Sequence, residues 1–275
     1  IIGLIGLMGI AGSLNAQNGN WNVYDTRSSE IGGNNISAIA PDSRGVWVGT
    51  YYGLSRLNNG QWMDYSMFND KLKDQSINCL MTDSRGVTWI GTDDYGVIEF
   101  DGTHWTEHSD ETRRLKMKFV KEIVQDNDGV YWIGVTLGGV VSYDGYTWEK
   151  YTPEDCELLS DFVLDIAVDR ANRKWITTNA GVSVYNGRRW TSYTVENSGL
   201  PDNIVPAIAS TTRSNTSSRP QRSTKNSIFF IKEVDSSASQ LNFYLYFCKL
   251  PILRNKYVFN TAVCVFASGI SPFRT

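Results

Sequence analysis

The sequence of 275 residues has only two histidines and four cysteines. Cys79, Cys156, Cys248 and Cys264 include no C-x-x-C pair, and their spacing does not suit a metal site. We therefore expect small buried thiols rather than a disulfide framework, although export would permit disulfides. G-x-S-x-G, P-loop and dinucleotide-binding motifs are all missing, so no cofactor is predicted.

Long apolar runs are also missing, because no stretch of about 18 residues is both apolar and uncharged. We expect no membrane span in the mature chain. Residues 1–12 are nonetheless almost wholly apolar, and a small residue, Ala16, follows them. This pattern predicts a signal peptide at 1–16 and a periplasmic or extracellular protein. The alternative is a buried hydrophobic strand.

Charge divides the chain into two segments. Residues 1–209 carry 17 Lys and Arg against 27 Asp and Glu, whereas residues 210–275 carry 9 against 2. An acidic body does not neutralise phosphates, which argues against nucleic acid as a partner. The reversal predicts a body at 17–209 and a separate tail at 210–275.

The nine tryptophans form two evenly spaced series. One series has intervals of 42 or 43 residues and comprises Trp47, Trp89, Trp132 and Trp175. The other has intervals of 41 to 43 residues and comprises Trp21, Trp62, Trp105, Trp148 and Trp190. A fixed period in the low forties with short strand signals is typical of β-propeller blades.

Each repeat contains the signals of four short strands. An apolar alternation precedes an aspartate and a tight turn, with the aspartates at 42, 83, 126 and 169 and the turn residues Gly45, Gly86, Gly129 and Asn172. A short Trp strand follows, which reads Trp-x-Gly-Thr in the first two repeats, Trp-Ile-Gly-Val in the third and Trp-Ile-Thr-Thr in the fourth. A glycine then opens a third strand, and an Asx-Gly hairpin and a second Trp come next. Frequent glycines disfavour helix, so Asp110 to Val124 is interpreted as a linker that leads into a first strand.

These repeats predict an all-β propeller of four-stranded blades, with four complete repeats and partial blades at both ends. Residues 21–24 read as a fourth strand, and residues 204–208 as a first strand that lacks the next three. In a closed ring, the terminal strand 21–24 would complete the last blade. The matching tryptophan is expected near position 218, where the residue is Ser218.

The motif W-I-G-T-x-x-x-G followed by a D-G-x-x-W-x-x-Y hairpin resembles the two-component regulator propeller repeat. The linker from Asn197 to Ile204 is similar as well. The resemblance covers residues 21–209 and implies an exported bacterial β-propeller. Many members are the sensing half of hybrid histidine kinases that respond to glycans. This sequence differs in having four copies rather than seven, and neither a kinase nor a sorting domain is recognisable.

The tail has two parts of different composition. Ten of the eighteen residues at 210–227 are Ser or Thr, which is typical of a linker or disorder. Residues 228–275 hold seven of the eleven phenylalanines but no repeat. Three interpretations stay open for this irregular, poorly packed tail: a small domain, a membrane-associated segment, or a frameshifted gene end, which we favour.

Two motifs imitate metal sites. His104 to His108 matches the H-x-x-E-H pattern of metalloproteases, but that chemistry needs a helix, and this segment aligns with a fourth strand. His108 takes the position that Tyr holds in other repeats. Asp126 to Gly129 resembles a calcium loop but lacks its later ligands. We therefore predict no metal site.

The loops between second and third strands vary while their flanks repeat, as expected if the flanks hold the fold. In a propeller these loops gather on one face, and here they supply aromatic and polar side chains suited to a sugar. The predicted ligand-binding residues are Tyr51, Tyr52, Asp93, Asp94, Tyr95 and Asn179. Ordinary exposed loop residues are the simpler alternative.

The sequence thus predicts a non-enzymatic binding module for a glycan or a protein ligand. A propeller polysaccharide lyase or hydrolase is the second hypothesis, but it needs a catalytic constellation that Asp93 and Asp94 alone do not supply. The third hypothesis is a truncated fragment of a larger propeller protein, whose open ends would expose unpaired strand edges.

Overall fold

The computed structural model describes residues 24–211, 227–234 and 242–247. Several predicted features lie outside them: the signal peptide at 1–16, the tryptophan at 21, most of the tail, Cys248 and Cys264. The chain forms two compact units, unit 1 and unit 2, with the boundary between Ile123 and Val124. Among the described residues, no helix has the length and apolar character needed to cross a membrane.

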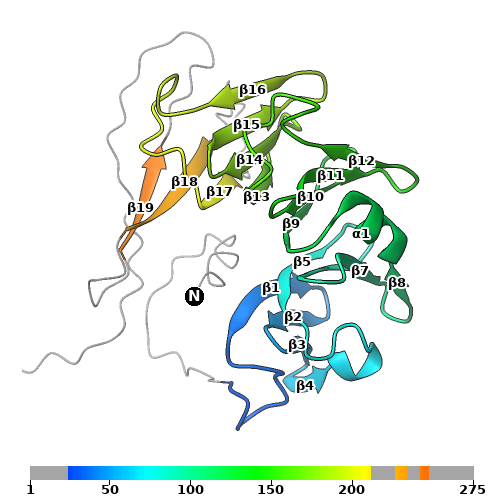
Figure 1. Cartoon of the computed structure of the whole chain (residues 1–275). Helices are drawn as coiled ribbons and strands as arrows, with labels where there is room; N and C mark the ends of the chain where they lie inside the picture. The colour runs from blue at the N-terminus through cyan, green and yellow to red at the C-terminus, as the bar shows by residue number, and fades with distance from the viewer. Residues whose placement is uncertain (1–23, 212–226, 235–241, 248–275) are drawn as a thin grey trace, which may run out of the picture. The chain divides into compact units, whose positions relative to one another are not determined.

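Four antiparallel sheets of four strands each follow the chain in order, and we call them blades 1 to 4 (Figure 1). Blades 1 and 2 comprise β1 (Ile36–Asp42), β2 (Gly45–Thr50), β3 (Gly53–Asn58), β4 (Gln61–Asp64), β5 (Ile77–Thr82), β6 (Thr88–Thr92), β7 (Val97–Phe100) and β8 (Trp105–Glu107). Blades 3 and 4 comprise β9 (Val120–Gln125), β10 (Tyr131–Val135), β11 (Gly139–Tyr143), β12 (Trp148–Tyr151), β13 (Val163–Val168), β14 (Lys174–Thr178), β15 (Gly181–Tyr185) and β16 (Trp190–Tyr193). The predicted four strands per repeat are confirmed.

The repeated aspartate closes the first turn of every blade and also holds the buried tryptophan. In blade 3, Asp126 Oδ1 accepts hydrogen bonds from two backbone N–H groups, and Trp132 Nε1 donates to Oδ2 at 3.0 Å. Equivalent Trp–Asp bonds join Trp47 to Asp42, Trp89 to Asp83 and Trp175 to Asp169. One carboxylate thus satisfies the turn and the indole N–H in the core.

The glycine of the Trp-x-Gly-Thr strand allows neighbouring blades to approach closely. In unit 1, a Cβ on Gly49 would lie 2.6 Å from Ile77 Cγ2, and one on Gly91 would lie 2.7 Å from Val120 Cγ1. In unit 2, a Cβ on Gly134 would lie 2.7 Å from Val163 Cγ1. At these three positions no side chain fits between the second strand of one blade and the first strand of the next, which explains the glycine there, whereas blade 4 has Thr177 in its place.

Most of the repeated turn residues have the backbone conformation that the sequence predicts. Gly86, Gly129 and Asn172 have φ angles of 84°, 87° and 59°, in the left-handed region. Gly45 is an exception: the turn in blade 1 is one residue shorter, so Gly45 pairs with Asp42 at the start of β2. A Cβ there would overlap the Leu57 carbonyl oxygen, so close approach is the constraint at this position.

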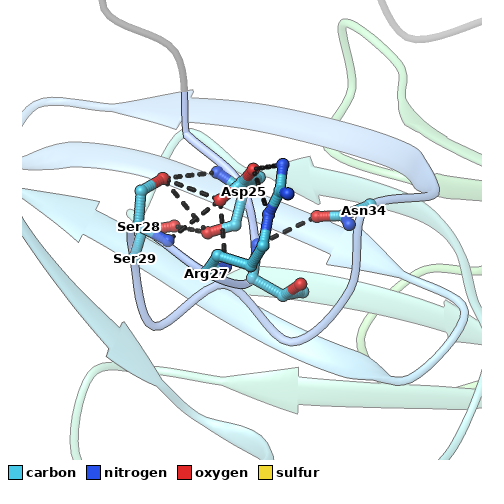
Figure 2. Close-up of polar contacts among 6 residues, drawn as sticks. Asp25, Arg27, Ser28, Ser29 and Asn34 are labelled. Carbon is cyan, nitrogen blue, oxygen red and sulfur yellow. Dashed lines mark hydrogen bonds and ion pairs between the residues drawn. The ribbon is translucent and has the colours of Figure 1, made fainter.

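The segment before β1 is a linker held by its own polar groups (Figure 2). Asp25 Oδ1 accepts hydrogen bonds from the backbone N–H groups of Arg27 and Ser28, and Thr26 N donates to Asn34 Oδ1 at 2.9 Å. After blade 4, Val195 N donates to Asn203 Oδ1 at 2.8 Å in the same way. The residues after Tyr24 and those after Tyr193 therefore make the same linker hydrogen bond.

Tyr24 is the one described residue of the predicted N-terminal strand 21–24, and it lies outside any strand. Its ring packs edge-on against Trp62 of β4, with 5.3 Å between ring centroids. The prediction that residues 21–24 complete the last blade otherwise falls outside the described residues.

One short helix interrupts the linker that the sequence predicts between blades 2 and 3. This helix, α1 (Ser109–Leu115), has Asp110 and Glu111 in its first turn and arginines in its last, as the helix dipole favours. Lys116 ends it in the left-handed conformation, with φ of 56°. The prediction of a linker without helix was therefore wrong for these residues, because local charge placement outweighs the short apolar pattern. A 3-10 turn, η1 (Ser66–Phe68), lies in the preceding linker.

The two tryptophan series differ in burial. The second-strand tryptophans are almost completely buried, as predicted. The described fourth-strand tryptophans are only half-buried, because each lies on the outermost strand and covers a third-strand residue. Trp105, for example, stacks on Phe100 with 4.2 Å between ring centroids. Among the cysteines, Cys79 is buried against Gly91, and Cys156 Sγ donates to Thr152 O at 3.3 Å.

The C-terminal strands correct one prediction about the partial blade. The first strand of this blade is β17 (Ala207–Thr211), and it is followed by β18 (Ser227–Val234) and β19 (Asn242–Phe247) in a three-stranded antiparallel sheet. The sequence predicted a first strand alone. The strands of the tail were missed because they carry neither the tryptophan nor the glycine of the repeat.

Candidate ligand-binding face

The loops between second and third strands leave most of the predicted ligand-binding residues exposed. Tyr51 and Tyr52, in the β2–β3 loop, are 55% and 58% exposed, and Tyr95, in the β6–β7 loop, is 42% exposed. Asp94 is exposed and Asp93 half-buried in that same loop. Blades 1 and 2 of unit 1 therefore each present aromatic rings at the same end of their strands.

A threonine at the end of the second strand fixes this loop in blades 1, 2 and 4, whereas blade 3 has Val135 at that position. Thr92 Oγ1 accepts a hydrogen bond from Tyr95 N at 3.0 Å and donates to Gly96 O at 3.1 Å. Thr50 and Thr178 make the equivalent pairs of bonds in blades 1 and 4. The threonine of the repeat motif thus holds the backbone, and the side chains between it and the next glycine have no part in closing the loop.

Two linkers enclose the β6–β7 loop. Asp93 N donates a hydrogen bond at 3.4 Å to the carbonyl oxygen of Ser76, which lies in the linker before β5. Phe119, which lies in the linker before β9, donates its N–H to Asp93 O at 2.7 Å. Asp94 N donates to Gln75 Oε1 at 3.1 Å. Linkers and second-to-third-strand loops therefore share one face of unit 1.

Both carboxylates of this loop have partners. Asp93 Oδ1 accepts a hydrogen bond from Asn78 Nδ2 at 2.6 Å. Asp94 Oδ1 forms an ion pair with Lys118 Nζ at 3.2 Å, between two side chains that are more than half exposed. Lys71 Nζ lies 5.9 Å from the centre of the Tyr95 ring and forms an ion pair with Glu107. Polar side chains that are held by these contacts therefore lie around the exposed ring of Tyr95.

Asn179 is exposed in the β14–β15 loop of unit 2. Its neighbour Ala180 donates its backbone N–H to Thr178 Oγ1 at 3.1 Å, so the loop is closed as in blades 1 and 2. The structure brings Asp93, Asp94 and Tyr95 together in one loop of unit 1. That Asn179 binds the same ligand stays a prediction.

The two histidines do not lie as a metal-binding pair. His108 stacks on Trp89 with 9° between the rings and 6.2 Å between centroids, and its Nε2 contacts Glu99 Oε1 at 2.6 Å. Tyr193 stacks on Trp175 in the same position of blade 4. His104 is exposed on the β7–β8 hairpin beside Asp101. Within the described residues, no group of three His, Cys, Asp or Glu side chains is placed to hold a metal ion.

Sequence reasoning missed several residues of this face, namely Lys71, Gln75, Asn78, Lys118 and Phe119. All except Asn78 belong to the linkers, which the repeat pattern treats as connections. One signal was available for Lys118 and Phe119: five cationic residues lie between positions 113 and 121 of a segment that is otherwise acidic.

Comparison with known proteins supports the repeat and the fold. The family described as "Two component regulator propeller" matches residues 30–52 and 71–94. No match was found among curated protein sequences. The extracellular domain of a hybrid two component system from B. thetaiotaomicron is 21% identical, with a TM-score of 0.56, over 84% of this chain and 28% of that one.

Two further solved structures have the same fold. A second extracellular domain from B. thetaiotaomicron is 15% identical, with a TM-score of 0.52, over 78% of this chain and 26% of that one. Virginiamycin B lyase from Staphylococcus aureus is 14% identical, with a TM-score of 0.55, over 77% of this chain and 66% of that one. This chain thus spans little more than a quarter of the length of either extracellular domain.

The predicted all-β propeller fold is confirmed by the blades and by these similarities. Two segments of the chain match the two component regulator propeller repeat, and in fold the chain resembles the extracellular domains of two-component systems.

Proposed function

We propose that this protein is an exported, non-enzymatic propeller module that binds a ligand on the face formed by its second-to-third-strand loops. The residues assigned to binding in unit 1 are Tyr51, Tyr52, Asp93, Asp94 and Tyr95. Asn179 is assigned to ligand contact in its own loop of unit 2. The ligand class that best suits these side chains is a glycan, with a protein partner as the alternative.

One observation carries the proposal: the exposed ring of Tyr95 lies in a loop whose backbone is fixed by Thr92 and whose carboxylates are held by Asn78 and Lys118. An exposed ring on a fixed backbone, with polar neighbours, suits a sugar, because the ring covers the C–H face of a pyranose while polar groups bond its hydroxyls. Preorganisation lowers the entropy lost on binding.

A sensing role is supported by the fold of the similar proteins, which are extracellular domains of two-component systems. We infer that ligand binding by this module serves recognition outside the cytoplasm. A catalytic role has weaker support, although propeller lyases share the fold. Asp93 and Asp94 already have partners, and His108 is packed between Trp89 and Glu99.

A broad glycan array probed with the full chain tests the proposal. We expect saturable binding that falls at least tenfold when Tyr95→Ala and Tyr52→Ala are combined. Tyr146→Ala is the matched control, because Tyr146 is fully exposed on the hairpin between β11 and β12, at the other end of its strands. Absence of binding across the array, or an equal loss with Tyr146→Ala, would contradict the proposal.

A further inference from the structure

The linker between blades 2 and 3 concentrates positive charge in an acidic segment. From the end of α1 to the start of β9, positions 113–121 contain five cations and no acidic residue: Arg113, Arg114, Lys116, Lys118 and Lys121. We call this stretch the cationic linker. All five are exposed, whereas three of the four apolar residues between them, Leu115, Met117 and Val120, are buried. The burial pattern anchors the linker through its apolar side chains and directs every cation to solvent.

Three of these cations are not used by the fold. Arg113 forms an ion pair with Asp110, and Lys118 with Asp94. Within the described residues, the side chains of Arg114, Lys116 and Lys121 have neither a hydrogen bond nor an ion pair. Clustered cations without counter-charges repel one another, so the positive charge of this linker does not stabilise the blade.

The repeat provides an internal comparison. The linker between blades 3 and 4, at 152–162, has the same place in its repeat but contains four acidic residues and no cation. The one between blade 4 and β17, at 194–206, contains two acidic residues and no cation. Because the blades fold with either sign of charge, the fold does not require the cations at 113–121.

The cationic linker adjoins the proposed binding face. Its Lys118 contacts Asp94, and its Phe119 donates a backbone hydrogen bond to Asp93, the residue two before Tyr95. Phe119 is 49% exposed although its φ angle is 54°, a conformation that a bulky residue rarely adopts. Unlike a buried core residue, this strained phenylalanine presents its ring to solvent beside the cations.

We propose that the cationic linker 113–121 makes the ligand of the Tyr95 face an acidic oligosaccharide, one whose sugars carry carboxylate groups. This inference rests on the proposed function and names its ligand class. Arg114 and Lys116 pair with the carboxylates of the sugar, since charge-assisted hydrogen bonds are the strongest polar contacts available on an exposed surface. Phe119 and Tyr95 supply the apolar surfaces against which the sugar rings pack.

The test is isothermal titration of the full chain with a hexasaccharide of galacturonic acid and with a neutral hexasaccharide of glucose. We expect tighter binding of the acidic sugar, with an affinity that falls as salt is raised. The combined variant Arg114→Gln with Lys116→Asn should weaken this binding about tenfold or more. Asparagine suits position 116 because it tolerates the left-handed conformation.

A matched control removes the same charge elsewhere. Arg188 and Arg189 are exposed on the hairpin between β15 and β16, where their backbone N–H groups donate to Asn186 Oδ1. Arg188→Gln with Arg189→Gln should leave binding unchanged. Phe119→Asn keeps the backbone conformation and should weaken binding of both sugars. Circular dichroism of each variant checks that it is folded.

The possible results separate the two proposals. Equal binding of acidic and neutral sugars, or equal losses in both charge variants, would overturn the acidic ligand while leaving the binding face intact. Tighter binding of a polyglutamate peptide or a single-stranded oligonucleotide would also overturn it. Binding of no oligosaccharide at all, with either sugar or on the array, would refute the proposed function itself.

Discussion

At the scale of the residue, similar chemistry stabilises the blades. An aspartate accepts the indole N–H of a buried tryptophan, and in blades 1, 3 and 4 a cation lies over the indole ring. The cations are Arg56 over Trp47, Lys174 over Trp132 and Arg173 over Trp175. Burial raises the pKa of Asp126, but hydrogen bonds from Lys174 and Trp132 outweigh it and hold that pKa below its usual value. Asp42 and Asp169 have lowered pKa values for the same kind of reason.

The Asp126–Lys174 pair is the most deeply buried of these in unit 2, with 2.8 Å between Oδ2 and Nζ. Lys174→Met leaves the carboxylate of Asp126 buried without its cation, which should cost about 3 kcal/mol of unfolding free energy in urea. Adding Asp126→Asn to Lys174→Met should recover part of the loss, because the uncompensated charge is then removed. An undiminished midpoint in the single variant would contradict this.

The lowered aspartate pKa values also predict a pH dependence. The unfolded carboxyls titrate near pH 3.9, above their folded pKa values, so their contribution is complete above about pH 4. It is lost as the pH falls through the folded pKa values. Urea midpoints should therefore change little from these groups between about pH 7 and pH 5, and fall below about pH 4. Asp169→Asn should flatten that fall.

At the level of strands, the packing of one blade on the next depends on bare backbone at the motif glycine. Gly91→Ala would place a methyl group against Cys79 and Val120, so it should destabilise the protein by about 1–3 kcal/mol. Urea unfolding measures the loss. Cys79→Ala in the same chain should relieve part of it, and strictly additive losses would show that the two residues are not in contact.

The strands that can be predicted from the sequence are those whose residues recur from repeat to repeat. Trp89, Gly91 and Asp83 recur because each makes a contact that the blades share, so their period reveals the four strands. Helix α1 could not be predicted in this way, since it occurs in a single linker. Residues such as Phe119 and Lys118 reach the candidate face through contacts with Asp93 and Asp94 that no local pattern encodes. Tyr95 was found because its loop varies between flanks that repeat from blade to blade.

At the scale of the whole molecule, the C-terminal strands extend the last partial blade beyond the repeat. Strand β17 pairs with β18 from Ala207 opposite Ile231 to Thr211 opposite Ser227. A chain ending at Thr211 would leave that edge of β17 without its ladder, so its urea midpoint should fall below that of the full chain. An unchanged midpoint would mean that residues 212–275 add nothing to the stability of the blades.

The central claim is that the loop-and-linker face of unit 1 binds a ligand, and hydrogen–deuterium exchange tests it most directly. The full chain is compared with and without the oligosaccharide that binds best on the array. The account predicts slower exchange at 93–95 and at 113–119, with the hairpins at 101–104 and 144–147 unchanged. Protection confined to those hairpins, or none at either place under saturating ligand, would contradict it.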